Sequence, residues 1–324
     1  MHVRLIRAVH APGLSGPWNG QYALQEELRR RIHGGLDWLS LGDPLKEGEL
    51  PWFWCWLDRS DALRWARHGR PFVQGPNTLF LDSRRPRIDR LECALLDAPS
   101  CRLMFTESEW YRRLILQHRG PENRAPLALW PYPIDPRPEG PADRPQHDLL
   151  IYVKNGHFPG LAQQLQGCYA RWHAIRYGHY RREELWDAAR RARCCCYLAD
   201  DDRGPLALAE ILLCGCPTVG LPTGAPFVTQ GQTGVLLDRL TAAACVEAIE
   251  RCFQLDRERV AALAAGQFDT RRIVDTVLKS LNEARTQPLA VWRSARLAPA
   301  LVPREASSAR RGQAVPHFRH KRRG

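Results

Sequence analysis

Short apolar runs of strand length alternate with amphipathic stretches of helical period through the first half of the chain. The predicted strands are Val3–Val9, Leu36–Leu39, Pro71–Val73, Arg102–Phe105 and Leu127–Leu129. The predicted helices between them are Gln21–Ile32, Asp61–Arg67 and Glu107–Gln117. This alternation is typical of a parallel sheet whose strands are connected by helices.

The second half repeats the alternation and begins with the continuous apolar run Leu149–Val153, which suits a strand buried on both faces. Further strands are predicted at Trp172–Ile175, Cys194–Leu198, Thr218–Gly220 and Val235–Leu237. Helices are predicted at Gly160–Gln166, Arg182–Ala192, Leu206–Cys214 and Ala242–Phe253.

Residues 131–145 contain six prolines and separate the two halves. Proline has no backbone donor and disfavours helix in the residue before it, so this segment predicts a linker. We therefore expect an α/β protein with two Rossmann-like domains, residues 1–138 and 139–285, facing each other across a cleft. Ligands of doubly wound sheets bind beyond the carboxyl ends of the strands, which makes this cleft the expected site.

The net charge of +12 is concentrated at the C-terminus, where residues 286–324 hold nine Lys or Arg and a single acidic residue, Glu305. This segment is also rich in Pro, Ser and Ala, which predicts a basic, disordered tail. Such a tail suits an anionic membrane face or a nucleic acid. The alternative is a solvated extension without a partner.

No apolar stretch approaches the roughly 18 residues that span a bilayer, and the N-terminal run predicts a strand and not a signal peptide. The eleven cysteines lack the paired spacing of a zinc site and lie mostly in apolar contexts. We expect reduced core cysteines, no metal, and a cytoplasmic protein, with peripheral contact at the inner membrane face through the tail.

Trp52, Trp54 and Trp56 alternate at strand spacing and so project from one face. We expect them to pack within a sheet. The alternative is stacking on sugar rings or contact with lipid.

The segment Leu198–Leu237 carries the most specific chemistry. A strand ends in three Asp residues, a Gly-Pro turn opens a helix, and Glu210 lies in the first turns of that helix. A carboxylate offers two acceptor oxygens, which suits the two hydroxyls of a ribose. Amides at a helix start favour a phosphate. Together these features suit a nucleotide diphosphate-sugar.

The same segment resembles the signature of the retaining family 4 glycosyltransferases of the GT-B fold. Two acidic residues with seven positions between them, Asp202 and Glu210, precede the helix end Cys214-Gly215-Cys216-Pro217. The downstream run Gly231-Gln232-Thr233-Gly234 resembles the next turn of that family. The chain departs from the pattern in having Asp202 where Glu is usual and Pro205 where a Gly amide is common.

The resemblance implies that Glu210 binds the nucleotide ribose and that Asp202 lies against the transferred sugar as a catalytic residue. It implies that the amides around Gly204 and Leu206 face the sugar and the diphosphate. Ile151–Gly156 resembles the opening strand of the second domain, so Lys154 is expected to neutralise the leaving diphosphate.

In the first half, the Gly-rich loop after the first strand resembles the loop that faces the donor. Its candidates are His10 as a catalytic residue, Gly16 in donor binding and Asn19 at the acceptor, with purely structural roles as the alternative. The runs Tyr177–Leu185 and Trp130–Asp135 resemble further connecting segments of the family.

The family implies transfer of a hexosyl or pentosyl group with retention and without a metal cofactor, from a UDP- or GDP-linked donor. The acceptor that we favour is a glycan or a lipid-linked precursor. A second hypothesis is a glycosyltransferase acting on modified DNA, because the protein is basic, with a pI near 9.5. A third is a catalytically inactive protein that binds a sugar nucleotide or a glycan.

Overall fold

The computed structural model describes thirteen segments of the chain. They are residues 2–6, 17–31, 36–39, 49–53, 59–75, 81–82, 85–88, 98–118, 126–130, 133–134, 137–154, 158–202 and 204–286.

The first half forms a six-stranded sheet in the order β2-β1-β3-β4-β7-β8, in which every pair of neighbours is parallel. Its strands are β1 (His2–Ile6), β2 (Leu36–Leu39), β3 (Glu49–Phe53), β4 (Phe72–Gln74), β7 (Cys101–Thr106) and β8 (Leu127–Leu129). Helices α1 (Pro17–Arg31), α2 (Arg59–Arg67) and α4 (Glu109–His118) lie between strands along the chain, and β5 (Leu81–Asp82) and β6 (Arg85–Ile88) form a separate antiparallel pair.

Trp52 is a core residue of this sheet. It lies in β3 and is fully buried, with its ring stacked on Phe105 at 5.2 Å between centroids and edge-on to Trp130 at 5.1 Å. Its indole nitrogen donates to the Gly75 carbonyl at 2.7 Å, so burial leaves no unpaired donor. Sheet packing is therefore confirmed for Trp52. Trp54 and Trp56 lie outside the described residues.

The second half forms a five-stranded parallel sheet in the order β10-β9-β11-β12-β13. Its strands are β9 (His147–Val153), β10 (Trp172–Arg176), β11 (Ala192–Leu198), β12 (Thr218–Gly220) and β13 (Gly234–Leu236). Its helices are α5 (Pro159–Cys168), α6 (Arg182–Arg191), α7 (Leu206–Leu213), α8 (Ala242–Cys252) and α9 (Arg257–Gln267).

Strand β11 is apolar on both faces because helices cover both. Cys194 and Cys196 face a core that includes Cys245 and Ile249 of α8. The residue between them, Cys195, faces the opposite core with α6 and α7. Nine cysteines fall within the described residues; all are free thiols, and all except Cys168 are buried. The expectation of core cysteines is confirmed for these eight.

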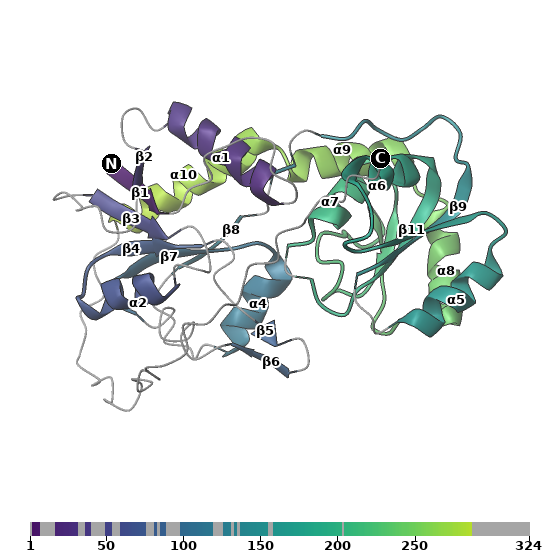
Figure 1. Ribbon diagram of the computed structural model, residues 1–324, viewed down its shortest axis with the longest axis horizontal. Coiled ribbons are helices and arrows are strands. Elements are labelled where there is room, and N and C mark those ends of the chain that lie inside the picture. The colour runs from purple at the N-terminus through teal and green to yellow at the C-terminus, as the bar shows by residue number, and fades with distance from the viewer. Residues whose placement is uncertain are drawn as a thin grey trace, which may run out of the picture. The chain divides into compact units, whose positions relative to one another are not determined.

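Helix α10 (Thr270–Thr286) follows the second half in sequence and yet belongs to the core of the first sheet (Figure 1). Its buried residues Ile273, Val274, Val277 and Leu281 pack with α1 and with Trp52 and Phe105 of the sheet. Arg31 of α1 pairs with Asp275 at 2.5 Å beside this contact. The sequence pattern did not predict α10 or α9. The predicted domain bounds, residues 1–138 and 139–285, stay a prediction. In the structure, α10 brings a segment from the end of the second half into contact with the first sheet.

Helix α1 begins at Pro17, four residues before its predicted start. Proline suits the first helical position, where its missing donor would have no partner. No helix in the described part of the chain is both long and apolar enough to cross a membrane.

The packing of α10 leads to a stability prediction. Leu281→Ala removes a fully buried side chain and is expected to lower the free energy of unfolding by about 2–5 kcal/mol, measured by urea denaturation. Lys279→Ala changes an exposed residue of the same helix and serves as the control. If both variants unfolded at the urea concentration of the unchanged protein, α10 would not be part of the core.

Candidate functional site

Two parallel strands bring a lysine and an aspartate together at one edge of the second sheet. Strands β9 and β11 are neighbours, with Leu198 opposite Val153, so their carboxyl ends lie at the same edge. Lys154 follows β9, and its amide donates to the Leu198 carbonyl at 3.0 Å. Asp202 follows β11, and its Oδ2 forms an ion pair with the Lys154 Nζ. The sequence assigned both residues to the site, and the structure places them in direct contact.

Asp202 is held from several sides. The Tyr197 hydroxyl donates to its Oδ2 at 2.9 Å, and its amide donates to the Thr223 carbonyl at 2.9 Å. Its residue exposure is 7%. The Thr223 segment approaches closely because of Gly224, where an added Cβ would lie 1.9 Å from the Ala199 carbonyl oxygen. The carboxylate is therefore fixed by backbone contacts as well as by its cation.

A group of tyrosines lies beneath the ion pair. Tyr197 stacks on Tyr152 with 4.8 Å between ring centroids, and the Tyr152 and Tyr180 hydroxyls lie 3.1 Å apart. Burial, and then the nearby Asp202 charge, raise the pKa of Tyr197 well above its ordinary value. Burial also raises the pKa of Tyr180 to about 12. The Tyr197 phenol therefore stays protonated and donates to Asp202 at all physiological pH values.

Helix α7 ends as the sequence predicted. Gly215 has a φ of +70°, which favours glycine, and its amide donates to the Leu212 carbonyl at 2.9 Å. The Cys216 amide donates to the Ile211 carbonyl at 3.2 Å, which completes a Schellman motif. A Cβ at Gly215 would lie 2.7 Å from the Arg257 carbonyl oxygen, so the close packing of α9 also requires glycine here.

Glu210 is buried on α7 and paired with an arginine. Its side chain is 8% exposed, and Oε1 forms an ion pair with the Nε of Arg182, the first residue of α6. Burial raises the pKa of Glu210, and the Arg182 guanidinium opposes that shift. The sequence predicted a carboxylate open to a ribose. The structure shows one that is nearly covered and already has a cationic partner.

Arg182 had no predicted role. The available signal was its place at the start of an amphipathic helix, with Trp186 four residues later on the same face. The Arg182 guanidinium lies 4.7 Å from the centre of the Trp186 ring. The contact with Glu210, 28 positions away, had no local signal.

The remaining predicted residues divide into two groups. Gly204 lies in the bend before α7, and Leu206 is the first residue of that helix, so both lie between Asp202 and Glu210 along the chain. Asn19 lies in the first turn of α1, but its side chain, like His10 and Gly16, falls outside what the structure describes. The roles assigned to His10, Gly16 and Asn19 therefore stay predictions.

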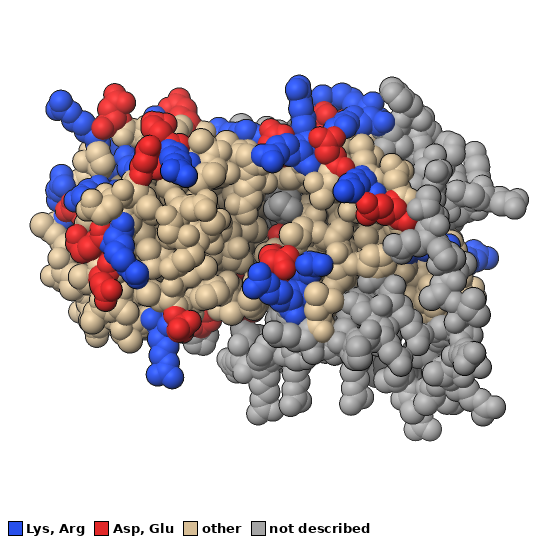
Figure 2. All heavy atoms as spheres, turned by 180° about the vertical axis from the view of Figure 1, so that it is seen from behind, with Lys and Arg blue, Asp and Glu red and all other residues tan. Residues whose placement is uncertain are grey.

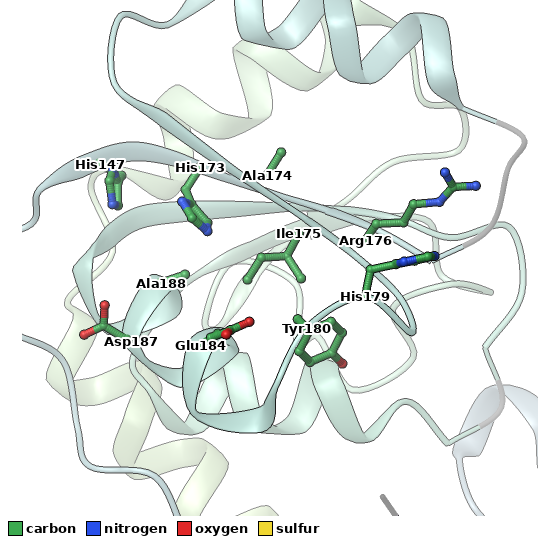
Figure 3. A pocket seen from close by; sticks show the side chains of 10 residues that line it. All are labelled: His147, His173, Ala174, Ile175, Arg176, His179, Tyr180, Glu184, Asp187 and Ala188. Atoms are coloured by element: carbon green, nitrogen blue, oxygen red, sulfur yellow. The ribbon is translucent and has the colours of Figure 1, made fainter. Parts of the chain in front are cut away.

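A hollow of about 460 Å³ lies between β10 and α6 (Figure 3). His173 of β10 and Asp187 and Glu184 of α6 line it together with His147 and Tyr180. Both carboxylates have partners, since Glu184 pairs with Arg181 at 3.0 Å and Asp187 with Arg191 at 2.8 Å. Burial, followed by the charge of His173, lowers the pKa of His147. Tyr180 connects this hollow to the tyrosine group beneath Asp202.

No family model matches the chain, and no curated protein matches it in sequence. Solved structures do resemble it. The apo form of the lipopolysaccharide outer core galactosyltransferase WaaB has a TM-score of 0.59 at 9% identity, covering 87% of this chain and 99% of its own. Alr3699/HepE from Anabaena in complex with UDP has a TM-score of 0.57 at 12% identity, covering 87% and 100%.

Sucrose-phosphate synthase from Thermosynechococcus elongatus has a TM-score of 0.56 at 15% identity, covering 87% of this chain and 98% of its own. Two parallel sheets flanked by helices, together with these likenesses, confirm the α/β prediction and the GT-B fold. The chain has the fold of the GT-B glycosyltransferases.

Proposed function

We propose that this protein is a glycosyltransferase that moves a sugar from a nucleotide-sugar donor to a glycan or lipid-linked acceptor, with retention at the anomeric carbon. One observation carries the proposal. Two buried carboxylates, Asp202 and Glu210, flank the start of α7 at the carboxyl edge of a parallel sheet, with Lys154 against the first of them. Ligands of doubly wound sheets bind at this edge.

Each residue has a proposed role. Glu210 accepts the ribose hydroxyls, and Asp202 faces the transferred sugar. Lys154 and the amides around Gly204 and Leu206 meet the diphosphate. The positive potential of these groups stabilises charge on the leaving diphosphate, which is the main catalytic contribution of a fixed site of this kind.

Lys154 has a contact that fits this role. Its ammonium pairs with Asp202 and lies 4.9 Å from the centre of the half-exposed Tyr177 ring. An ammonium group has three donors, so Lys154 can keep Asp202 and also bind a phosphate oxygen. In this proposal the donor phosphates bind the Lys154 ammonium, whose position is set by its ion pair with Asp202 before the donor binds.

On the side of the first half we propose His10 as a further catalytic residue, Gly16 as a donor contact and Asn19 as an acceptor contact. We propose a UDP- or GDP-linked hexose or pentose as the donor, without a metal cofactor. The complex of Alr3699/HepE with UDP supports testing uridine nucleotides first.

The proposed location is cytoplasmic, with the basic tail of residues 286–324 against the inner membrane face.

Modified DNA is the weaker acceptor hypothesis. On the face shown in Figure 2, basic and acidic side chains of the described residues lie side by side. Among the ion pairs of the described residues, Arg137 pairs with Asp269 at 2.8 Å. A nucleic-acid surface requires a patch of one sign, and this face does not support that function.

A catalytically inactive binding protein is the second candidate, and a specific observation favours it. Pro205, which has no amide donor, occupies the N-cap of α7, and Glu210 is nearly covered. Slow hydrolysis of the donor in the absence of an acceptor would distinguish the enzyme from this candidate.

Nucleotide binding is tested by thermal unfolding of the full chain with UDP, GDP, ADP and CMP. A ligand that binds only the folded state stabilises it by about 2.7 kcal/mol at 100 times its Kd. We expect UDP or GDP to raise Tm by a few degrees. If none of the four nucleotides moved Tm, the proposed function would be rejected.

Glu210→Ala is expected to reduce transfer and nucleotide affinity by roughly 10- to 100-fold, because a charge-assisted hydrogen bond contributes about 1.5–3 kcal/mol. Donor turnover and isothermal titration are the measurements, with circular dichroism to verify folding. Glu247→Ala, which changes an exposed carboxylate of α8, is the control. Near-normal turnover by folded Glu210→Ala protein would remove Glu210 from the site.

Lys154→Met tests the diphosphate contact. Affinity for UDP is expected to fall by roughly 10- to 100-fold while affinity for uridine, which has no phosphates, stays within about twofold. Lys279→Met, on the exposed side of α10, is the matched control. An equal loss of UDP and uridine binding would show that Lys154 supports the fold of the site and not the phosphates.

A further inference from the structure

Arg182 and Glu210 form an ion pair close to the proposed donor site. The Arg182 side chain is 22% exposed and the Glu210 side chain 8%, so the pair is largely removed from water. The two residues come from different helices, α6 and α7, which pack against each other beside the sheet.

Arg182 is itself held in place by α6. Two hydrogen bonds close the first turn of the helix: the Arg181 amide donates to Glu184 Oε2 at 3.1 Å, and the Glu184 amide donates to the Arg181 carbonyl at 3.0 Å. One turn later the Trp186 ring lies beneath the guanidinium. Leu185 is fully buried and anchors the helix to the core. The Arg182 guanidinium is therefore held in place by its contacts with Trp186 and Glu210, on a helix that is anchored to the core.

The charged and titratable groups around Glu210 come from three segments. Arg182 and Glu183 lie on α6, Tyr180 precedes that helix, and Cys214 follows α7. Burial, and to a smaller extent the charge of Glu183, favours the protonated form of Glu210, whereas Arg182 favours the ionised form. Burial raises the pKa of the Cys214 thiol, and that of Tyr180 is about 12, so both are neutral at physiological pH.

The state of Glu210 decides what it can bind. An ionised carboxylate accepts hydrogen bonds from both hydroxyls of a ribose, whereas a protonated one loses part of that capacity and the added strength of the charge. Arg182 engages Oε1 through Nε, a contact that restrains the orientation of the carboxylate and favours its ionised form.

We propose that Arg182 is a positioning residue for donor selection: by pairing with Glu210 it aims the carboxylate at the ribose, so that preference for ribonucleotides over deoxyribonucleotides depends on Arg182. This inference rests on the proposed function, in which Glu210 binds the ribose of the donor.

The test measures the affinity of the full chain for UDP, 2′-deoxy-UDP and 3′-deoxy-UDP, and for the three guanosine counterparts. We expect the unchanged protein to bind the ribonucleotide about tenfold more tightly than the deoxy forms. Arg182→Gln is expected to reduce this ratio to less than about twofold, and Arg182→Lys, which keeps the charge but not the planar group, to an intermediate value.

Arg181→Gln is the matched control, because Arg181 is the adjacent residue, is 82% exposed and pairs with Glu184. Its affinity ratio should equal that of the unchanged protein. A substitution that only loosened the fold would weaken the ribo and deoxy forms alike, so the ratio separates positioning from structural support.

The pH profile gives an independent readout. Without Arg182, burial and Glu183 favour the protonated form of Glu210, so its pKa rises further. We expect the UDP affinity of Arg182→Gln protein to decrease, as the pH is lowered, by a larger factor than that of Arg181→Gln protein, because protonation of Glu210 increases as pH falls.

The outcomes separate the two proposals. If the unchanged protein bound no nucleotide of the six, the proposed function and this inference would both be wrong. If it preferred the ribonucleotide and folded Arg182→Gln protein kept that preference, only the inference would be wrong. Should Arg182→Gln not fold, Arg182→Lys decides: an intermediate ratio supports the positioning role, and an unchanged ratio overturns it.

Discussion

The candidate site depends on burying two carboxylates, each against its own cation. Asp202 and Glu210 are 7% and 6% exposed as residues, and they pair with Lys154 and Arg182 respectively. A buried charge is costly unless it is paired and hydrogen-bonded, and removal of one partner leaves the other without compensation. The two pairs therefore constrain which side chains can occupy this edge of the sheet. In each pair the positive charge of the lysine or arginine offsets the negative charge of the carboxylate.

The fold supplies this arrangement through parallel strand pairing and close backbone approach. Lys154 reaches Asp202 because β9 and β11 are neighbours with their carboxyl ends together. Gly224 lets a distant segment pack against the end of β11, and Gly215 lets α7 stop where α9 crosses it. Both positions reject any larger residue, since an added Cβ would lie closer to backbone than real contacts allow. The rigidity of the site thus comes from backbone packing, and the side chains add its chemistry.

The first half shows that sequence order and packing need not coincide. Its aromatic core of Trp52, Phe105 and Trp130 is completed by α10, which is separated from the first sheet by the whole of the second. The first sheet therefore completes its core with a helix that follows the whole of the second sheet in the sequence. The likeness to the solved GT-B structures spans 87% of the chain.

The sequence by itself predicted many of the local elements, although not α9 or α10, and the residue types of the candidate site. Strands such as Thr218–Gly220 and Leu127–Leu129 were predicted at their observed bounds, and the helix end at Gly215 was read from glycine and proline. The spacing of Asp202 and Glu210 led us to predict a nucleotide site there, because the strand end and the helix start on which that prediction depends are encoded locally. Only the tertiary structure decided that Lys154 pairs with Asp202, 48 positions away, and Arg182 with Glu210, 28 positions away. Those contacts depend on the sheet order β10-β9-β11 and on how α6 packs against α7, which no periodicity along the chain specifies.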